Sequence, residues 1–242
     1  MLETITIFDD ESAASKKAQT HHITDIKQAV RDQNRANIYI DDKFFCSLDI
    51  SQVVDFHLKI GKELSDDDRA ELKRASEFGK FYQRALEYVL VRPRSAKEIR
   101  DYLKRKTISR KVRVKNRKTG EYQVKEKPGY DQSLVPLVLQ RLDERGYVDD
   151  RRFAELWVEN RNTAKGISIK KLRLELTQKG ISSQIIDEVL ESSSRSDTEE
   201  LQKIIAKKAN RYPDQQKLIQ YLVRQGFNYS DVLDALSSLD GS

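Results

Sequence analysis

The second half of the chain contains one pattern written twice, 46 residues apart. This shift places Gly180 on Gly226 and Leu190 on Leu236. In each copy, apolar residues recur at helical spacing, and the glycine follows an apolar run, where a left-handed residue often ends a helix. A helical unit of this length buries little apolar surface alone and gains stability by stacking on its neighbours. The repeat therefore predicts tandem helical units.

A third copy lies upstream, and an additional segment divides it. A shift of 73 places Ser95 on Ser168, whereas further along a shift of 51 places Gly129 on Gly180. The two shifts differ by 22 residues, which indicates an insertion at about 107–128. The first copy is therefore expected to carry an arm that the other two copies lack.

These periodicities divide most of the chain into helical segments. Only 9 Gly and 4 Pro occur among 242 residues, which favours a mainly α fold over one built from turns and short strands. We predict tandem three-helix repeats that stack in an elongated curved array. The predicted repeats cover 78–149, 150–193 and 194–242, and their first helices are expected at 78–91, 150–162 and 198–210.

The first eighty residues follow a different pattern. Residues 1–22 lack periodicity and are expected to form a disordered tail, whereas 23–77 are predicted to form a small N-terminal strand-helix domain, rich in β structure. Asp41-Asp42 has the chemistry of a turn between two strands. Strands are expected at 23–30, 36–40 and 44–48, and helices at 50–58 and 65–79. Three aspartates begin the second helix, where the helix dipole favours negative charge, and this position explains them better than a metal site does.

The inserted arm reads as a basic β-hairpin. Polar and apolar residues alternate on both sides of Asn116-Arg117-Lys118-Thr119-Gly120. At ~3.3 Å per residue, the arm would project about 15 Å. The basic alternating pattern of the arm favours a role as a clamp on DNA phosphates or as a finger that binds a partner. The alternative is that the arm is a solubilising loop. We expect Val112, Val114, Tyr122 and Val124 on one face and Lys111, Arg113, Lys115, Gln123 and Lys125 on the other.

Positive charge is concentrated around this arm. The whole chain has a net charge of +6, but residues 84–127 contain 16 basic against 5 acidic residues, a net charge of +11. A focused field of one sign attracts polyanions, so nucleic acid, or a filament coated with it, is the favoured partner. A solvated helix face is the alternative. The candidate binding residues are Arg92, Arg94, Arg100, Lys104, Arg105, Lys106, Arg110, Lys111, Arg113, Lys115, Arg117, Lys118, Lys125, Lys127, Arg151, Arg152, Lys170, Lys171 and Arg173.

The sequence offers little material for catalysis. Three histidines and the single Cys46 have no metal-ligand spacing, and neither the dinucleotide fingerprint nor the phosphate loop of NTPases is present. We therefore expect no catalytic residues, no metal and no cofactor. Trp157 lies in a periodic apolar run, which favours a place in the core over a platform for base stacking. No apolar stretch reaches the ~18 residues of a membrane span, so we expect a cytoplasmic protein with no membrane partner.

Short motifs along residues 23–236 carry a family resemblance. They are Asn37-Ile38-Tyr39-Ile40-Asp41, Gly61-Lys62-Glu63-Leu64, Arg84-Ala85-Leu86-Glu87-Tyr88-Val89-Leu90, Arg92-Pro93-Arg94-Ser95, Arg141-Leu142, Gly146-Tyr147-Val148-Asp149-Asp150, Phe153-Ala154 and Lys179-Gly180-Ile181. In combination, they resemble the bacterial RecX family, the regulators of the RecA recombinase. The basic insertion departs from the usual repeat of that family.

The resemblance implies a regulator that is not an enzyme. Such a protein would bind as a monomer along the helical groove of RecA filaments on single-stranded DNA. It would limit filament growth, ATP hydrolysis and strand exchange in DNA repair, recombination and the SOS response. Its own contact with single-stranded DNA would be weak, either direct or through the filament. From the residues alone, an autonomous DNA-binding array with helix-turn-helix corners stays open, and charge alone also allows an RNA-associated or ribosome-associated protein.

Overall fold

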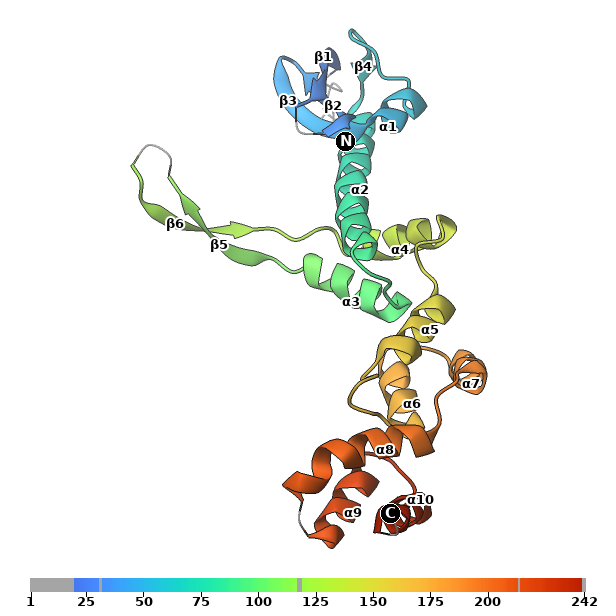
Figure 1. Cartoon of the computed structure of the whole chain (residues 1–242). Coiled ribbons are helices and arrows are strands. Elements are labelled where there is room, and N and C mark those ends of the chain that lie inside the picture. The colour runs from blue at the N-terminus through green and yellow to red at the C-terminus, as the bar shows by residue number, and fades with distance from the viewer. Residues whose placement is uncertain (1–19, 31, 117–118, 213, 241–242) are drawn as a thin grey trace, which may run out of the picture. The chain divides into compact units, whose positions relative to one another are not determined.

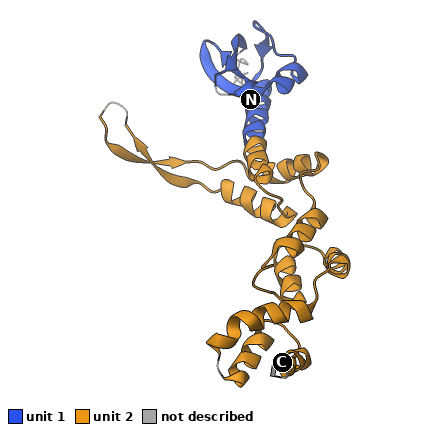
Figure 2. Cartoon of the chain, in the orientation of Figure 1, with its two compact units in different colours: residues 1–80 blue, residues 81–242 orange. Residues whose placement is uncertain are grey.

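The chain is mostly helical, with a small sheet near its N-terminal end (Figure 1). The structure is a computed structural model that describes residues 20–30, 32–116, 119–212 and 214–240. It divides into two compact units after residue 80 (Figure 2). The strands are β1 (His21–Ala29), β2 (Asp32–Ile40), β3 (Lys43–Asp49), β4 (Glu63–Leu64), β5 (Arg110–Lys115) and β6 (Tyr122–Lys127).

The helices account for most of the second unit. They are α1 (Ile50–Asp55), α2 (Asp66–Leu90), α3 (Ala96–Lys106), α4 (Leu134–Glu144), α5 (Asp150–Asn160), α6 (Ile169–Gln178), α7 (Ser183–Ser192), α8 (Asp197–Lys208), the short 3₁₀ helix η1 (Ala209–Arg211), α9 (Gln215–Arg224) and α10 (Tyr229–Asp240).

The first unit contains a four-stranded antiparallel sheet in the order β3-β2-β1-β4. The three strands expected from the alternation are confirmed as β1, β2 and β3, whereas the short β4 was not predicted. Asp41 and Asp42 have φ angles of 49° and 62°, the left-handed pair that a tight hairpin turn requires. β1 begins at His21, inside the predicted tail, and residues 1–19 of that tail lie outside the described residues.

One face of this sheet forms the core of the first unit. Ile38 and Ile40 alternate with less buried residues along β2, so both point to the same side. They pack with Ile23, Leu48, Leu64 and Leu72, and the last of these belongs to α2. The Cys46 thiol is buried in the same cluster, and burial raises its pKa to about 11, which makes it an unreactive core residue.

The two helices predicted at 65–79 and 78–91 are wrong as separate elements, because α2 is one continuous helix of 25 residues. Gly79 lies inside it and has no proline beside it, and a single interior glycine costs only about 1 kcal/mol of helix stability. This glycine makes room for a close neighbour, since a Cβ there would lie 3.1 Å from Oδ2 of Asp49. The three aspartates stand in the first turn of α2, as expected.

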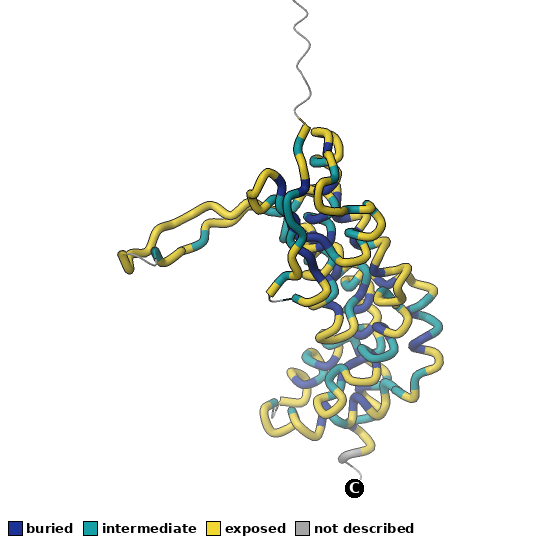
Figure 3. Tube along the Cα trace, turned by 90° about the horizontal axis from the view of Figure 1, so that it is seen from above, coloured by how far each residue is buried: buried dark blue, intermediate teal, exposed yellow. Residues whose placement is uncertain are grey.

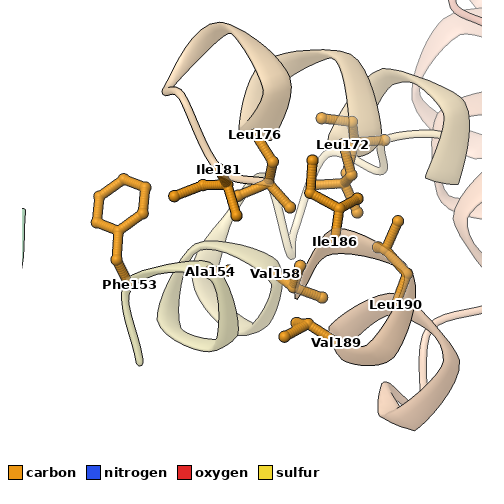
Figure 4. Close-up of a cluster of buried hydrophobic side chains, with 10 residues drawn as sticks. Phe153, Ala154, Val158, Leu172, Leu176, Ile181, Ile186, Val189 and Leu190 are labelled. Carbon is orange, nitrogen blue, oxygen red and sulfur yellow. The ribbon is translucent and has the colours of Figure 1, made fainter. Parts of the chain in front are cut away.

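Two clusters of apolar side chains hold the later helices of the second unit. Helices α5, α6 and α7 meet around buried residues that recur at helical spacing (Figure 4). Helices α8, α9 and α10 enclose a similar cluster. The helices expected at 150–162 and 198–210 correspond to α5 and α8. The first cluster contains Phe153, Ala154, Val158, Ile167, Leu172, Leu176, Ile181, Ile186, Val189 and Leu190, and the second contains Leu201, Ile204, Ile205, Leu218, Leu222, Phe227, Val232 and Leu236.

Two serines make the same pair of contacts in different parts of the second unit. Ser95 caps the N-terminus of α3, and its hydroxyl donates a hydrogen bond to the carbonyl of Lys179 at 2.8 Å. Ser168 caps α6 and donates to the carbonyl of Gln225 at 2.6 Å. Each serine is buried, so each ties the start of one helix to the end of another that lies far along the chain.

Two aspartates complete the same arrangement. The N–H of Ala96 donates to the carboxylate of Asp150 at 2.8 Å, and the N–H of Ile169 donates to the carboxylate of Asp197 at 2.7 Å. Backbone N–H groups in the first turn of a helix have no partner within the helix, so an outside carboxylate satisfies them. Helix α3 is thereby joined to α5, and α6 to α8, by equivalent bonds.

Candidate functional site

The inserted segment forms the β-hairpin β5–β6, which is exposed along nearly its whole length (Figure 3). Lys115 pairs with Tyr122, and the N–H of Asn116 donates to the carbonyl of Glu121 at 2.7 Å. Six residues, 116–121, therefore connect the two strands. The candidate residues Arg117 and Lys118 lie in this connection, outside the described residues.

The hairpin is closed at its base by close backbone contact. A Cβ on Gly129 would clash with the carbonyl oxygen of Thr107, so no other residue fits there without a shift of the backbone. The N–H of Tyr130 also donates to the carbonyl of Lys106 at 3.1 Å. The two ends of the insertion expected at 107–128 thus meet beside the end of α3.

The predicted division of the hairpin into an apolar and a basic face is wrong. Val112 lies opposite Lys125, and Arg113 lies opposite Val124. Residues directly opposite each other in an antiparallel pair share a face, so valine is joined by lysine on one side and arginine by valine on the other. The predicted faces required an odd number of connecting residues. The even number moves every side chain of β6 to the other face, because side chains alternate with a period of two.

The candidate cations of the hairpin are therefore divided between two mixed faces. We call them the tyrosine face and the valine face after their apolar members. The tyrosine face holds Lys111, Arg113, Lys115, Tyr122, Val124 and Glu126, and the valine face holds Arg110, Val112, Val114, Gln123, Lys125 and Lys127. Each face carries three cations.

A group of cations gathers where α3 runs into β5. Burial and the nearby charges of Arg110, Arg84 and Arg105 lower the pKa of Lys106. Like charges lower the pKa of a lysine only when they are close, so these four side chains share one region of positive potential. Arg84 begins the basic run but is not among the candidate residues predicted from the sequence. It lies on α2, and the sequence does not show that α2 brings it close to the end of α3.

Arg100 and Lys104 lie on the exposed side of α3, next to α4. They line an open cavity of about 650 Å³ whose other walls include Val135 and Leu139. Within the described part of the chain, neither cation forms an ion pair, and the same holds for Arg105, Lys111 and Lys115. These charges are accordingly available to an outside partner.

Arg92 and Arg94 are instead engaged by the chain itself. Both form ion pairs with Glu98, at 3.1 and 4.0 Å. Burial opposes ionisation of Glu98, but hydrogen bonds from Lys179 and Arg92 outweigh it and lower its pKa. The guanidinium of Arg94 also lies 4.0 Å from the centre of the Tyr88 ring. These contacts mark Arg92 and Arg94 as residues that position the start of α3.

The Tyr88 ring belongs to a stack that links α2 and α3. Its centre lies 3.9 Å from that of Tyr102, with the two rings nearly parallel at 3°. Arg94 covers the outer side of the first ring, and the ammonium of Lys106 lies 4.9 Å from the second. Stacked rings between two cations favour a fixed crossing of the two helices.

The later candidate cations do not join this group. Arg151 pairs with Glu188, and Arg173 pairs with Asp187, so each holds α7 against its own neighbour. Arg152 lies 3.5 Å from Glu155 of the same helix. Lys171 donates to the side-chain amide oxygen of Gln225 at 2.6 Å, whereas Lys170 is exposed and lines an open cavity of about 490 Å³ with Leu174 and Val223.

Trp157 is a half-buried member of the α5–α7 core, as the sequence favoured. Its ring centre lies 5.6 Å from that of Phe153, and its indole N–H donates to Glu175 at 3.1 Å. Two cations, Arg161 and Lys179, cover the ring at 5.2 and 5.0 Å. These neighbours occupy the surface that a nucleic-acid base would need.

Two further features are missing from the described residues. None of their helices combines the length and the apolar character needed to cross a bilayer. No three side chains of His, Cys, Asp or Glu in the described ranges come together in a group that could hold a metal ion.

The chain matches known proteins over nearly its full length. A family model described as the N-terminal domain of regulatory protein RecX matches residues 21–65, and one described as the second three-helix domain of RecX matches residues 149–190. The second match covers α5, α6 and α7.

Curated relatives and a solved structure agree with these matches. The chain is 31% identical over 226 residues to regulatory protein RecX of Bacillus licheniformis, covering 90% of this chain and 78% of the relative. It is 30% identical over 225 residues to that of Bacillus subtilis, covering 90% and 77%. A crystal structure of regulatory protein RecX superposes with a TM-score of 0.67 at 25% identity, covering 88% of this chain and 99% of the other. This chain therefore belongs to the RecX family of regulatory proteins.

Proposed function

We propose that this protein regulates the RecA recombinase by binding in the groove of RecA filaments on single-stranded DNA. It limits filament growth, ATP hydrolysis and strand exchange, and it acts as a cytoplasmic monomer without a cofactor. Membership of the RecX family supports a regulatory role. The partner follows from the resemblance of its motifs to regulators of that recombinase, and the cationic surface of the chain is suited to a nucleoprotein filament.

The gathering of cations at the end of α3 is the observation that carries this proposal. Burial of Lys106 lowers its pKa, and the nearby charges of Arg110, Arg84 and Arg105 lower it further, so the four side chains share one region of positive potential. Placing like charges together is unfavourable for the isolated chain. A polyanionic partner offsets this repulsion, and the salt dependence of binding is then expected to be steep.

We assign the filament contact to the cations that the chain leaves unpaired. The contact is assigned to Arg100, Lys104, Arg105, Lys106 and, on the hairpin, Lys111, Arg113 and Lys115, with Lys170 extending the surface on α6. Arg92, Arg94, Arg151, Arg152 and Arg173 are assigned instead to holding the chain's own helices, because each has a carboxylate partner.

We further propose that residues 78–149, 150–193 and 194–242 act as three tandem three-helix units in an elongated curved array, after an N-terminal domain at 23–77. The equivalent bonds of Ser95 and Ser168 support this division, because they fall at matching places of successive units. Several units on one chain bind a repeating filament with high effective concentration, so weak contacts combine into tight binding.

The test is the DNA-dependent ATPase of RecA on single-stranded DNA. The full-length protein is expected to lower the steady-state rate when it is far less abundant than RecA. The variant R100Q/K104Q/R105Q should need a higher concentration for the same inhibition, whereas the control R151Q/R152Q, which removes two cations already paired, should need little more than wild type.

The outcomes separate this function from its alternative. Absence of inhibition at every ratio would overturn the proposal. Tight binding to naked duplex at physiological salt, with no preference for RecA-coated single strands, would instead identify an autonomous DNA-binding array.

A further inference from the structure

The two faces of the hairpin carry the same number of cations but differ in their other side chains. Each carries three cations, yet the tyrosine face alone has an aromatic ring, that of Tyr122. This ring is 62% exposed, and the neighbouring Val124 is 64% exposed. On the valine face, Val112 is half-buried and Val114 is 40% exposed. The more exposed apolar surface of the hairpin thus lies on the tyrosine face.

The cations of the tyrosine face form a regular row. Lys111, Arg113 and Lys115 occupy alternate positions of β5, so their Cα atoms are about 6.7 Å apart along the strand. All three are exposed. An extended single strand of nucleic acid is flexible enough for successive phosphates to follow such a row, whereas the phosphates of a duplex have a fixed helical arrangement.

Tyr122 stands beside this row, where a base would project. It lies directly opposite Lys115 across the two strands, and Arg113 lies diagonal to it with its guanidinium 5.3 Å from the ring centre. The arginine holds the ring in place by a cation–π contact and adds a second planar group to which a base can stack. The one carboxylate on the described part of this face, Glu126, accepts a hydrogen bond from Ser109 at 2.7 Å near the base of the hairpin.

We propose that the tyrosine face of the hairpin is a binding site for single-stranded DNA, in which the cation row contacts phosphates and Tyr122 stacks on an unpaired base. The row alone would bind any nucleic acid. The exposed ring selects single strands, because the faces of the bases in a duplex are already covered by their neighbours. The site gives no hydrogen-bond readout of base edges, so it is indifferent to sequence.

This inference rests on the proposed function and deepens it, since it assigns contact with the single-stranded DNA to one face of the hairpin. Bare oligonucleotide is nevertheless a sufficient probe. Direct binding to it can fail while inhibition of the RecA ATPase stands, and inhibition can fail while direct binding stands. The two proposals are therefore separately testable.

The experiment uses the full-length protein and a fluorescein-labelled oligodeoxythymidylate, with fluorescence anisotropy as the readout over a range of salt concentrations. Two triple variants remove the same charge from opposite faces of the same hairpin. K111Q/R113Q/K115Q removes the row on the tyrosine face, and R110Q/K125Q/K127Q is the matched control on the valine face. Circular dichroism confirms that both variants remain folded.

The tyrosine-face variant is expected to bind at least about tenfold more weakly, and the log–log salt slope should fall by about 2, as three phosphate contacts on a single strand predict. The valine-face variant should stay within about threefold of wild type. Equal losses in the two variants would overturn the assignment to one face, and no loss in either would place the DNA elsewhere.

Tyr122 provides the second arm. Y122A is expected to weaken binding by about tenfold, within the range of base–aromatic stacking, whereas Y122F should restore wild-type affinity because it keeps the ring. Loss in Y122F as large as in Y122A would overturn the stacking role. Oligouridylate is titrated in parallel, and a loss confined to this RNA probe would overturn the assignment to DNA.

Discussion

The backbone of Gly180 passes so close to Lys97 that a Cβ on the glycine would lie 2.8 Å from the Cβ of the lysine. Gly180 also has a φ angle of +82°, in the left-handed region. It ends α6 at the point where the N-terminus of α3 packs against it, beside the bond from Ser95 to Lys179. One residue thus both ends a helix and allows two helices to meet.

Alanine at Gly180 is expected to be more harmful than alanine at Gly146. Gly146 has a similar φ of +72° but no atom within 4 Å of the added Cβ, so G146A should lose about 1 kcal/mol from backbone strain alone. G180A should lose about 2–4 kcal/mol, because the methyl group also displaces the neighbouring helix. Urea unfolding of the two variants measures the difference, and equal losses would show that the close packing is not maintained in solution.

Loss of the buried serine hydroxyls should destabilise the protein beyond loss of a helix cap. S95A and S168A each remove a cap and leave the carbonyl of Lys179 or Gln225 without its donor, so each is expected to cost about 2–3 kcal/mol. Ser182 caps α7 but is exposed, and S182A should cost about 1 kcal/mol. The free energy of unfolding in urea is the measurement. A control variant as damaging as the other two would contradict the bridging role.

Glu175 should make part of the stability depend on pH. A hydrogen bond from Arg161, opposed by burial and helped by Trp157, lowers its pKa. A carboxyl with a lowered folded-state pKa contributes stability that is fully present above the unfolded pKa of about 4.3 and is lost as the pH falls through the folded value. The wild type should therefore exceed E175Q in unfolding free energy at pH 7, with the gap closing below about pH 4.

Denaturant unfolding between pH 7 and pH 3 checks this expectation. E191Q, which changes an exposed carboxylate at the end of α7, is the control and should show no such closing gap. A gap for E175Q that stays constant over the whole range would assign the loss to altered packing instead of charge.

Removal of the hairpin should separate binding from stability. Replacing residues 110–127 by two glycines deletes eight cations and two carboxylates, which brings the net charge from +6 to zero. The described side chains of this segment contribute nothing to the buried apolar core, so the free energy of unfolding should change by less than about 0.5 kcal/mol. Inhibition of the RecA ATPase should weaken markedly. Unchanged inhibition would remove the hairpin from the interface.

The sequence predicted those parts of the fold that depend on local periodicity. The apolar spacing along α5 and α8 and the glycines after α6 and α9 report which side of each helix is buried and where it ends, and both agree with the structure. The short β4 has two residues and no alternation of its own. Only its pairing with β1 makes it a strand, and that pairing involves residues distant in sequence.

The candidate site was less accessible to sequence reasoning. Charge density indicated the right region, but whether a cation is free or paired depends on tertiary neighbours, such as Glu98 for Arg94 or Asp187 for Arg173. Which side chains of the two strands share a face depends on whether the number of connecting residues is odd or even. Alternation within each strand does not report that number. Arg84 joins the cation group only because two helices cross.

The contact between Gly129 and Thr107 has a practical consequence. Since the chain leaves the helical body and returns to it at almost one point, an arm of any length adds no displacement to the helices on either side. The exposed hairpin beyond this contact is thus a suitable place to attach a fluorophore, a crosslinker or a fused reporter. A probe placed there would follow the arm through its encounter with a partner while the rest of the molecule stays unmodified.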